Sequence, residues 1–392
     1  MEELISRRET LRKGLAAASL LALMPDWALP AMAEDASDVP FTDIPNTFNP
    51  NNPNSTARLL DIRKIDGPIT PKDQFFGTQH FNKPEIDGEK YRLKFTGLVH
   101  KQAEYSLSDL RAMKSTEIIN GYECSGNSPR AMEGLCSNGR FTGVRLSSIL
   151  KQLTIDPRAR EAVFLGTDRG PLDIVFRQQT YKLEQQFGRS MTLENALKPD
   201  VMVAYALNGE PLTRDQGFPA RLIVPGWYGV ANVKWLAEVH LQEDRYLGNF
   251  QARWYRTLRG VGGTGEDADP ETQWVETEVT RMHPKSVIAR VRKTAGAHSI
   301  LGFVLNDGTP LKSVEVQIDG GAWQPATLDK SNSRYSWKLF TYRWEGATPG
   351  EHTLVSRVTD ANGVMQPEAA ALKRKKTFLE DNGQFPRKVM IS

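Results

Sequence analysis

The stretch GYECSGNSPR, residues 121–130, contains Cys124, one of two cysteines in a chain of 392 residues. A cysteine of a hydrophobic core usually lies in an apolar segment, whereas Cys124 lies between a glutamate and a Ser-Gly-Asn turn. Gly126 permits close approach of the backbone and Asn127 tolerates left-handed conformations, so this turn can present the thiol to a ligand. Three interpretations are open, namely a disulfide with Cys136, a reactive thiol or a metal ligand.

The amino terminus has the features of an export signal. Arg7 and Arg8 precede a short apolar segment at residues 14–24, and Ala-Met-Ala at residues 31–33 is a small-x-small cleavage site. The paired arginines look like a twin-arginine signal, so we expect residues 1–33 to be removed and the mature protein to be periplasmic. Two cysteines in an exported protein favour a disulfide on arithmetic alone.

Charge and composition argue against several classes of partner. Acidic and basic residues nearly balance, with a formal net charge of +3, so nothing indicates binding to nucleic acid or to a membrane surface. No segment after the signal has the ~20 consecutive apolar residues of a membrane span. The six histidines are scattered, and there is no C-x-x-C-H motif for a covalently attached haem.

The hydrophobic patterns predict two domains. In the first, residues 34–265 with an N-terminal arm, residues 91–96 alternate as a half-buried strand, and Ser106 opens a short helix with a capping box. Strand and helix patterns mix without regular alternation, which predicts an α+β fold. The Gly-rich, acidic stretch at residues 260–270 is the expected domain boundary. Further patterns predict helices at residues 144–153 and 193–197 and strands at residues 162–165 and 221–224.

The sequence pattern of the second domain, residues 270–392, predicts a β-sandwich. Residues 314–318 alternate between apolar and polar side chains and run into Asp319-Gly320-Gly321, a hairpin signal. Alternation returns at residues 335–340 and 353–358. Short strands separated by turn residues are typical of a sandwich of about 100 residues. No catalytic constellation is visible in this domain.

Several segments, in the same order along the chain, match the motifs of one enzyme family. Residues 123–127 (ECSGN) are similar to a Cys-Ala-Gly-Asn motif, and residues 75–80 (FFGTQH) to a Phe-Phe-x-Arg-Asn-His segment. Residues 140–146 (RFTGVRL) match Arg-Trp-x-Gly-Val-x-Leu, and residues 214–221 and 233–236 follow in the expected order. Over nearly the whole mature chain, the sequence thus resembles the sulfite oxidase family of molybdopterin enzymes. The resemblance implies a molybdopterin domain followed by an immunoglobulin-like β-sandwich that mediates a homodimer.

The resemblance also implies a molybdenum–molybdopterin cofactor whose metal is bound by Cys124, with Cys136 aligned with no ligand. From the residues alone, structural roles stay open: Arg221 could belong to a buried ion pair, Lys234 could face solvent, and Asp168 could form an Asx turn. The residues implied to bind the cofactor are Phe76, Thr78, Gln79, His80, Asp168, Gln216, Arg221, Asn232, Val233 and Lys234.

The catalytic side departs from the family pattern. Tyr255 takes the place of the family's pocket tyrosine, where a phenol can hydrogen-bond a substrate oxygen and relay a proton. Trp254 stands where an aspartate is expected, and Thr78 stands where the family has an oxyanion-binding arginine. Arg130 and Arg253 remain as candidates for binding an anion, although they could equally lie over apolar surface.

The resemblance implies a haem-free oxidoreductase that oxidises sulfite to sulfate by oxygen-atom transfer. A separate c-type cytochrome would then accept the electrons. A reductase of S- or N-oxides from the same family is the alternative, favoured by the missing arginine and aspartate. A cofactor-free binding module is a third possibility, which Cys124 and Arg221 disfavour.

Overall fold

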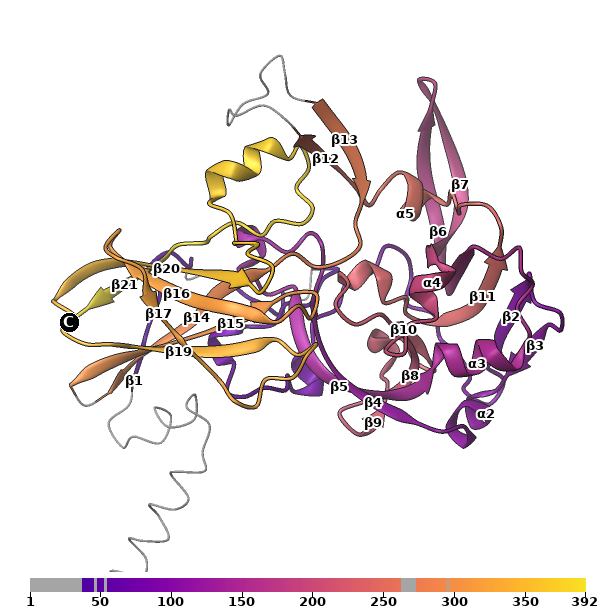
Figure 1. The fold of residues 1–392 in the computed structure, drawn as a ribbon, viewed down its shortest axis with the longest axis horizontal. Helices are drawn as coiled ribbons and strands as arrows, with labels where there is room; N and C mark the ends of the chain where they lie inside the picture. The colour runs from indigo at the N-terminus through magenta and orange to yellow at the C-terminus, as the bar shows by residue number, and fades with distance from the viewer. Residues whose placement is uncertain (1–36, 46–47, 53–54, 262–272, 295) are drawn as a thin grey trace, which may run out of the picture.

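The structure is a computed structural model, and it describes residues 37–392 except 46–47, 53–54, 262–272 and 295. The expected signal peptide, residues 1–33, lies outside the described residues. Figure 1 shows two β-rich bodies side by side, with most of the described chain before residue 262 in one and most of the chain after residue 284 in the other. Among the described helices, none is long and apolar enough to cross a membrane.

The first domain is built on two sheets. One has the strand order β3-β2-β11-β6-β7, in which β11 runs parallel to β2 and the other pairs are antiparallel. The second has the order β10-β8-β5-β4, with the short strand β9 also paired to β8. The strands are β2 (Leu93–Gly97), β3 (Ala103–Tyr105), β4 (Thr116–Glu123), β5 (Cys136–Arg145), β6 (Glu161–Phe176), β7 (Gln179–Thr192), β8 (Met202–Leu207), β9 (Glu210–Pro211), β10 (Arg221–Ile223) and β11 (Leu236–Gln242).

Short helices connect these strands. The capping box predicted at Ser106 is present, because its hydroxyl accepts the Asp109 N–H while the Asp109 carboxylate accepts the Ser106 N–H. The helix predicted from residue 144 begins at Leu146 instead, because Val144 and Arg145 still pair with β8. The α-helices are α2 (Leu107–Ala112), α3 (Leu146–Gln152), α4 (Leu193–Ala196) and α5 (Asn249–Ala252). The 3₁₀ helices are η2 (Ile62–Lys64), η3 (Lys72–Gln74), η4 (Pro129–Ala131), η5 (Arg214–Gln216), η6 (Gly229–Ala231) and η7 (Ala369–Arg374).

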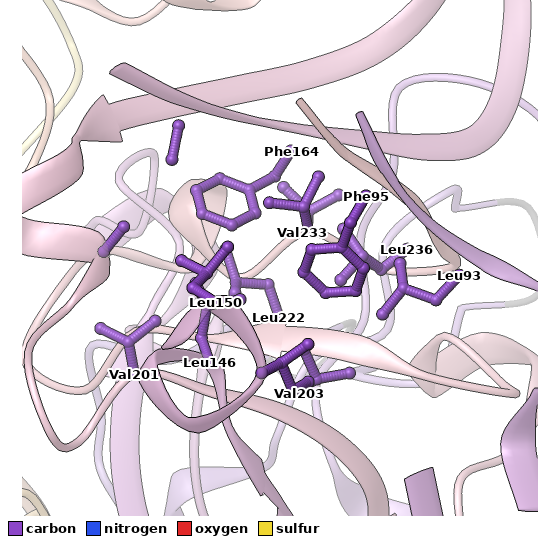
Figure 2. Packing of buried hydrophobic residues seen from close by; sticks show 14 of the residues in the cluster. Leu93, Phe95, Leu146, Leu150, Phe164, Val201, Val203, Leu222, Val233 and Leu236 are labelled. Atoms are coloured by element: carbon purple, nitrogen blue, oxygen red, sulfur yellow. The ribbon is translucent and has the colours of Figure 1, made fainter. Parts of the chain in front are cut away.

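The main hydrophobic core of the first domain lies between its sheets and α3 (Figure 2). Strand alternation points Leu93 and Phe95 inward and Lys94 outward, as the sequence pattern predicted. Leu146 and Leu150 lie one helical turn apart on α3 and pack into the same cluster. Each fully buried apolar side chain of this kind contributes about 1.5–3 kcal/mol to burial free energy. This packing fixes the strand ends from which the cavity described below is built.

The second domain is a sandwich of two sheets, which confirms the predicted β-sandwich. The strand orders are β1-β14-β15-β19-β18 and β17-β16-β20-β21. The predicted hairpin turn follows β16, where Asp319 and Gly320 have positive φ angles of 50° and 70°. The strands are β1 (Ser37–Val39), β14 (Lys285–Thr294), β15 (Ala297–Leu305), β16 (Leu311–Ile318), β17 (Gln324–Pro325), β18 (Thr327–Leu328), β19 (Lys338–Trp344), β20 (Gly350–Asp360) and β21 (Arg387–Ile391).

The N-terminal arm packs on the sandwich. Strand β1 pairs with the edge of β14, and the side chains of Phe41 and Ile44 lie in the sandwich core. The sequence assigns this arm to residues 34–265 together with the first domain. The structure places it on the second domain because the β14 edge supplies hydrogen-bond partners and the sandwich supplies the apolar contacts.

Two ribbons project from the same side of the molecule in Figure 1. One is the outer part of β6 and β7, and the other is the antiparallel pair β12 (Arg256–Val261) and β13 (Gln273–Glu278). Most of the stretch predicted as the domain boundary, residues 260–270, lies outside the described residues. The strands on either side of it pair with each other, so this stretch joins the two strands of a hairpin. The chain enters the sandwich only after Glu278, at Lys285.

Candidate active site

An open cavity lies in the first domain, where the ends of several strands and loops meet. Its wall combines the loop at residues 76–80, the end of β4, the base of β6 and β7, the segment at residues 229–235 and the residue before β12. The residues predicted from the sequence that line it are Phe76, Thr78, Gln79, His80, Cys124, Asp168, Arg221, Asn232, Val233, Lys234 and Tyr255. Segments far apart in the sequence therefore contribute to one cavity.

Other lining residues were not predicted from the sequence. They include Tyr122, Phe187, Asp215 and Trp235. Tyr122 lies two positions before Cys124 at the end of β4, so strand alternation was a signal that could have found it. Phe187 and Asp215 carried no such signal, because their place in the cavity depends on how distant segments pack.

Cys124 directly follows β4, and the turn after it presents its sulfur to the cavity. The Gly126 N–H donates to Cys124 Sγ at 3.5 Å, and the Asn127 N–H donates to the Cys124 carbonyl at 2.9 Å. Burial raises the pKa of the Cys124 thiol, and the neighbouring Glu123 carboxylate adds to the effect. Cys124 and Cys136 are both free thiols in the structure, so the disulfide alternative is not realised. Cys136 is fully buried instead.

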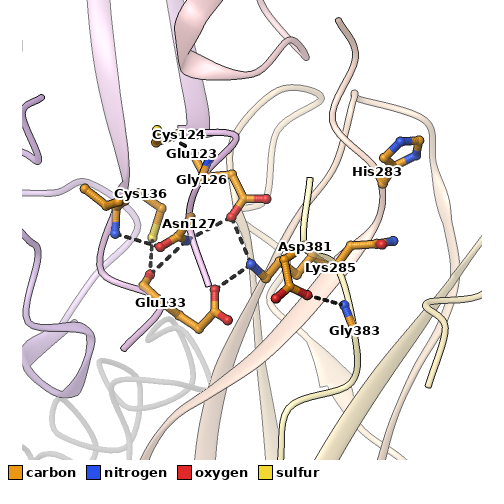
Figure 3. Close-up of polar contacts among 12 residues, drawn as sticks. Glu123, Cys124, Gly126, Asn127, Glu133, Cys136, His283, Lys285, Asp381 and Gly383 are labelled. Carbon is orange, nitrogen blue, oxygen red and sulfur yellow. Dashed lines mark hydrogen bonds and ion pairs between the residues drawn. The ribbon is translucent and has the colours of Figure 1, made fainter. Parts of the chain in front are cut away.

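A buried polar network supports the Cys124 turn from behind (Figure 3). The Asn127 side-chain amide donates to Glu123 Oε2 at 2.8 Å, and its oxygen accepts the Leu135 N–H at 2.9 Å. Lys285, the first residue of β14, lies 3.2 Å from Glu123 Oε2 and 2.5 Å from Glu133 Oε2. All three charged side chains are only 1% exposed. The sandwich thus supplies the cation that holds together the loop carrying Cys124.

Two cations face the opposite part of the cavity. The Arg221 guanidinium donates to the carbonyls of Gln216 and Asn232, each at 3.0 Å. Lys234 Nζ donates to the Asp215 carbonyl at 3.1 Å, and desolvation together with the Arg221 charge lowers the pKa of Lys234 to about 7. Their neighbours Leu222 and Val233 belong to the hydrophobic core, which fixes both backbones.

Several buried polar atoms of this region have no hydrogen-bond partner among the described residues. They are Arg221 Nε, Asn232 Nδ2 and Asp168 Oδ1. Desolvation raises the pKa of Asp168 to about 6. Because a buried polar atom without a partner destabilises the fold by about 1–3 kcal/mol, such a group needs a partner from outside the chain.

Aromatic rings surround the remaining wall. The Tyr255 hydroxyl lies 2.6 Å from His80 Nε2, and the His80 ring stacks on Phe250 with a centroid distance of 4.5 Å. The edge of Trp254 meets the same histidine ring at 5.6 Å, and Trp254 itself is 49% exposed. Burial raises the pKa of Tyr255, so its phenol is protonated at neutral pH. Among the lining residues that the structure describes, arginine and lysine occur only at Arg221 and Lys234.

Three predicted site residues do not line this cavity. Gln216 is committed to η5, where its amide oxygen accepts the Thr213 N–H and its NH₂ donates to the Lys72 carbonyl. Arg253 is exposed and lies over the Phe176 ring at 6.0 Å. Arg130 borders a separate surface hollow beside Phe378. These three side chains therefore do not border the cavity in this structure, and their functional roles stay predictions.

Comparison with known proteins shows which proteins this chain resembles. A family model described as "Oxidoreductase molybdopterin binding domain" matches residues 80–250. Human mitochondrial sulfite oxidase is 29% identical over 360 residues, which cover 83% of this chain and 62% of the human protein. This chain is thus similar to sulfite oxidases over most of its length and contains a match to a molybdopterin-binding domain. The Arabidopsis thaliana sulfite oxidase is 25% identical over 341 residues, covering 76% of this chain and 82% of the plant protein.

The fold is also similar to that of a solved structure. The structure matches the crystal structure of the sulfane dehydrogenase SoxCD from Paracoccus pantotrophus with a TM-score of 0.71 and 24% identity, covering 90% of this chain and 91% of that chain. The match to the human sulfite oxidase covers only 62% of the human protein, so this chain spans about three fifths of that relative.

The chemistry of the cavity fits the molybdopterin cofactor of the sulfite oxidase family. Cys124 offers a soft sulfur ligand for molybdenum. Arg221 and Lys234 offer charge to an anionic phosphate group, and Asp168 and Asn232 have free polar atoms for the amino and ring nitrogens of a pterin. Arg221 Nε, Asp168 Oδ1 and Asn232 Nδ2 are the atoms of this set that lack a partner within the described chain.

Proposed function

We propose that this protein is a molybdenum-dependent oxidoreductase that oxidises sulfite to sulfate. The observation that carries the proposal is the arrangement around one cavity, in which the Cys124 thiol and the Tyr255 hydroxyl face the same space as the Arg221 and Lys234 cations. The match to the molybdopterin-binding domain and the similarity to sulfite oxidases support the cofactor and the reaction class. When bound, the molybdenum cofactor supplies oxygen-atom transfer and takes up two electrons.

The residues of this chain would then bind the cofactor and orient the substrate. Cys124 would hold the metal, and Arg221, Lys234, Asp168 and Asn232 would hold the pterin and its phosphate. Tyr255 would orient the substrate. If neutral His80 donates its Nε2–H to the phenol oxygen, the phenol O–H is left free to donate to a substrate oxygen.

Sulfane oxidation is a second candidate, because the substrate side lacks an arginine fork. Thr78 lines the cavity where the family pattern has an oxyanion-binding arginine, and the rings of His80, Phe187 and Tyr255 surround that space. A dianion such as sulfite binds best to paired guanidinium groups. SoxCD, which has the same fold, is described as a sulfane dehydrogenase. An uncharged or singly charged sulfur group would suit this aromatic lining better than a dianion would.

Steady-state kinetics with purified, molybdenum-loaded protein test these proposals. Sulfite turnover with ferricyanide as acceptor supports the first, and turnover of a persulfide without sulfite turnover supports the second. Reduction of a sulfoxide by a viologen dye, without turnover of either reduced sulfur compound, would instead assign the protein to the S- or N-oxide reductases.

A Thr78→Arg substitution is expected to lower KM for sulfite. The unmodified protein should have a high KM for sulfite, because no guanidinium of the described lining lies on the substrate side. The new guanidinium would restore a bidentate contact to the oxyanion, which is worth about 1.5–3 kcal/mol, or roughly a tenfold or larger decrease in KM. Thr78→Met is the uncharged control of similar reach. A low-micromolar KM in the unmodified protein would contradict this account of the cavity.

A Tyr255→Phe substitution is expected to lower kcat by about 10²-fold or more, with the fold and molybdenum content unchanged. Only the hydroxyl is removed, and the ring remains in contact with Arg189 and His80. Steady-state kinetics beside metal analysis measure the effect. If the variant turns over as fast as the unmodified protein, the Tyr255 hydroxyl plays no part in the reaction.

The proposal extends to the setting of the enzyme. We propose a periplasmic, haem-free homodimer that passes electrons to a separate c-type cytochrome. The twin-arginine sequence supports the location, and the resemblance of the second domain to the dimerisation domain of the sulfite oxidase family supports the dimer. Light scattering at micromolar concentration tests the dimer, fractionation of producing cells tests the location, and absorbance of added cytochrome c tests the electron transfer.

A further inference from the structure

Arg189 is a buried cation next to the cavity. It lies on β7, is 2% exposed, and forms no ion pair with any carboxylate among the described residues. Its Nη2 donates to the Val279 carbonyl at 2.8 Å, its Nη1 donates to the Phe250 carbonyl, and its Nε has no partner in the described chain. Desolvation lowers the pKa of Arg189 to about 10, so the group is still charged at neutral pH.

Burying the Arg189 charge lowers the stability of the fold, so a charged side chain at this position indicates a role that an apolar side chain could not fill. A buried cation without a direct ion pair loses hydration free energy of several kcal/mol, which two carbonyl contacts and the attraction of the Glu278 carboxylate offset only in part. A methionine at the same position would fill similar space without that loss. The contacts of Arg189 therefore indicate what the charge is for.

Both carbonyls that Arg189 binds belong to segments that flank Tyr255. Phe250 lies on α5, just before Tyr255 in the chain. Val279 lies across from Tyr255, and its N–H donates to the Tyr255 carbonyl at 3.1 Å. The guanidinium carbon also lies 5.7 Å from the centroid of the Tyr255 ring. Arg189 thus contacts the backbone on both sides of Tyr255 and the face of its ring.

These contacts form a continuous chain from Arg189 to the phenol hydroxyl of Tyr255. Arg189 binds the Phe250 carbonyl, the Phe250 ring stacks on His80, and His80 Nε2 lies 2.6 Å from the Tyr255 hydroxyl. A cation over the face of a phenol also draws electron density from the ring and makes the O–H a better hydrogen-bond donor. Together, these contacts fix the backbone, the ring and the hydroxyl of Tyr255.

We propose that Arg189 is a positioning residue for Tyr255, which fixes the phenol hydroxyl in the direction that the reaction requires. The inference rests on the proposed function, in which Tyr255 acts on the substrate. Arg189 itself does not line the cavity among the described lining residues, so its effect on turnover passes through Tyr255.

A double-mutant cycle separates positioning from general support of the fold. Four proteins are compared by steady-state kinetics: the unmodified chain, Arg189→Gln, Tyr255→Phe and the double variant. Arg189→Gln is expected to lower kcat about tenfold or more with little change in KM, since misplacement of a catalytic group by about 1 Å can lower a rate 10²-fold. In the Tyr255→Phe background the same substitution should lower kcat no further.

Two further variants keep the result interpretable. Arg189→Lys retains the charge and can reach one carbonyl, so it should recover part of the lost kcat, and it carries the cycle if Arg189→Gln does not fold. Arg387→Gln removes a fully buried arginine of the sandwich as a matched control, and it should lower the thermal midpoint while leaving kcat unchanged. Molybdenum and pterin content and the thermal midpoint are measured for every variant.

The outcomes distinguish failure of this inference from failure of the proposed function. Equal decreases of kcat on Arg189→Gln in both backgrounds would reduce Arg189 to a structural residue and overturn the inference. A slow Tyr255→Phe beside a normal Arg189→Gln would overturn the inference alone. A Tyr255→Phe that turns over normally would overturn both the role of Tyr255 and the inference that depends on it.

Discussion

Cys124→Ser protein is expected to fold and to retain pterin while its turnover falls below detection. A serine hydroxyl is a far weaker ligand for molybdenum than a thiolate, whereas the pterin is expected to be held by Arg221, Lys234, Asp168 and Asn232. The thermal midpoint should change little, because the side chain lies at a turn and packs only partly against its neighbours. Metal analysis, extraction of the pterin and steady-state kinetics together measure the result.

Cys136→Ser is the matched control. The Cys136 sulfur donates to the Glu133 carbonyl at 3.2 Å, a contact that a serine hydroxyl can replace. This variant should keep its turnover. Full activity of Cys124→Ser would remove the thiol from the reaction, and a large loss of stability of Cys136→Ser under oxidising conditions alone would revive the disulfide alternative.

Lys285→Met is expected to lower the free energy of unfolding by about 3–5 kcal/mol, because it leaves two buried carboxyl groups without their cation. Glu123 and Glu133 are each 1% exposed beside Lys285. Burial already raises the pKa of Glu123 to about 7, and the Lys285 charge opposes that shift. Burial also raises the pKa of Glu133, and without the lysine the pKa of both carboxyls would rise further. Chemical denaturation followed by circular dichroism measures the change.

The same substitution at an exposed pair provides the control. Lys388 lies 3.0 Å from Glu351 on the sandwich surface, with side chains 50% and 47% exposed. Lys388→Met should lower the free energy of unfolding by at most about 1 kcal/mol. Adding Glu123→Gln and Glu133→Gln to Lys285→Met should recover part of the loss, since no charge is then left buried. Equal effects at Lys285 and Lys388 would show that the buried network is not a special point of stability.

The sequence located cavity residues where neighbours in the chain are neighbours in space. Cys124, Arg221 and Lys234 lie in short motifs on strand ends, and the core packing of adjacent residues such as Leu222 and Val233 fixes their direction. Motif matching therefore transfers well there.

The sequence did not indicate where the side chains of Arg130 and Arg253 point. Both lie in segments that resemble family motifs, yet neither side chain borders the cavity. Gln216 is occupied by a capping interaction with Thr213, and the Thr-x-x-Gln spacing is a sequence signal that could have indicated it. Arg189 gave no sequence signal, because its carbonyl partners on Phe250 and Val279 are distant in the chain.

The sequence predicted the type of secondary structure in each domain. Period-two alternation and turn residues identified the sandwich, because each strand buries one face. The attachment of β1 to the sandwich was not predictable, since three residues of edge strand carry too little pattern. The boundary expected in the Gly-rich stretch at residues 260–270 rests on composition, and hairpin loops and linkers share the same residue types.

The strand β21, at the carboxyl end of the chain, bears on the order of events during protein synthesis. Val389 and Ile391 lie in the sandwich core, and Phe41 near the start of the described chain bridges to Val389. A chain emerging from the ribosome cannot finish the sandwich until residues 387–391 have been made, whereas the first domain can begin to fold earlier. Because Lys285 belongs to that sandwich, the support behind the Cys124 turn is completed after most of the first domain has been made. Loading of the cofactor would accordingly follow the synthesis of β21.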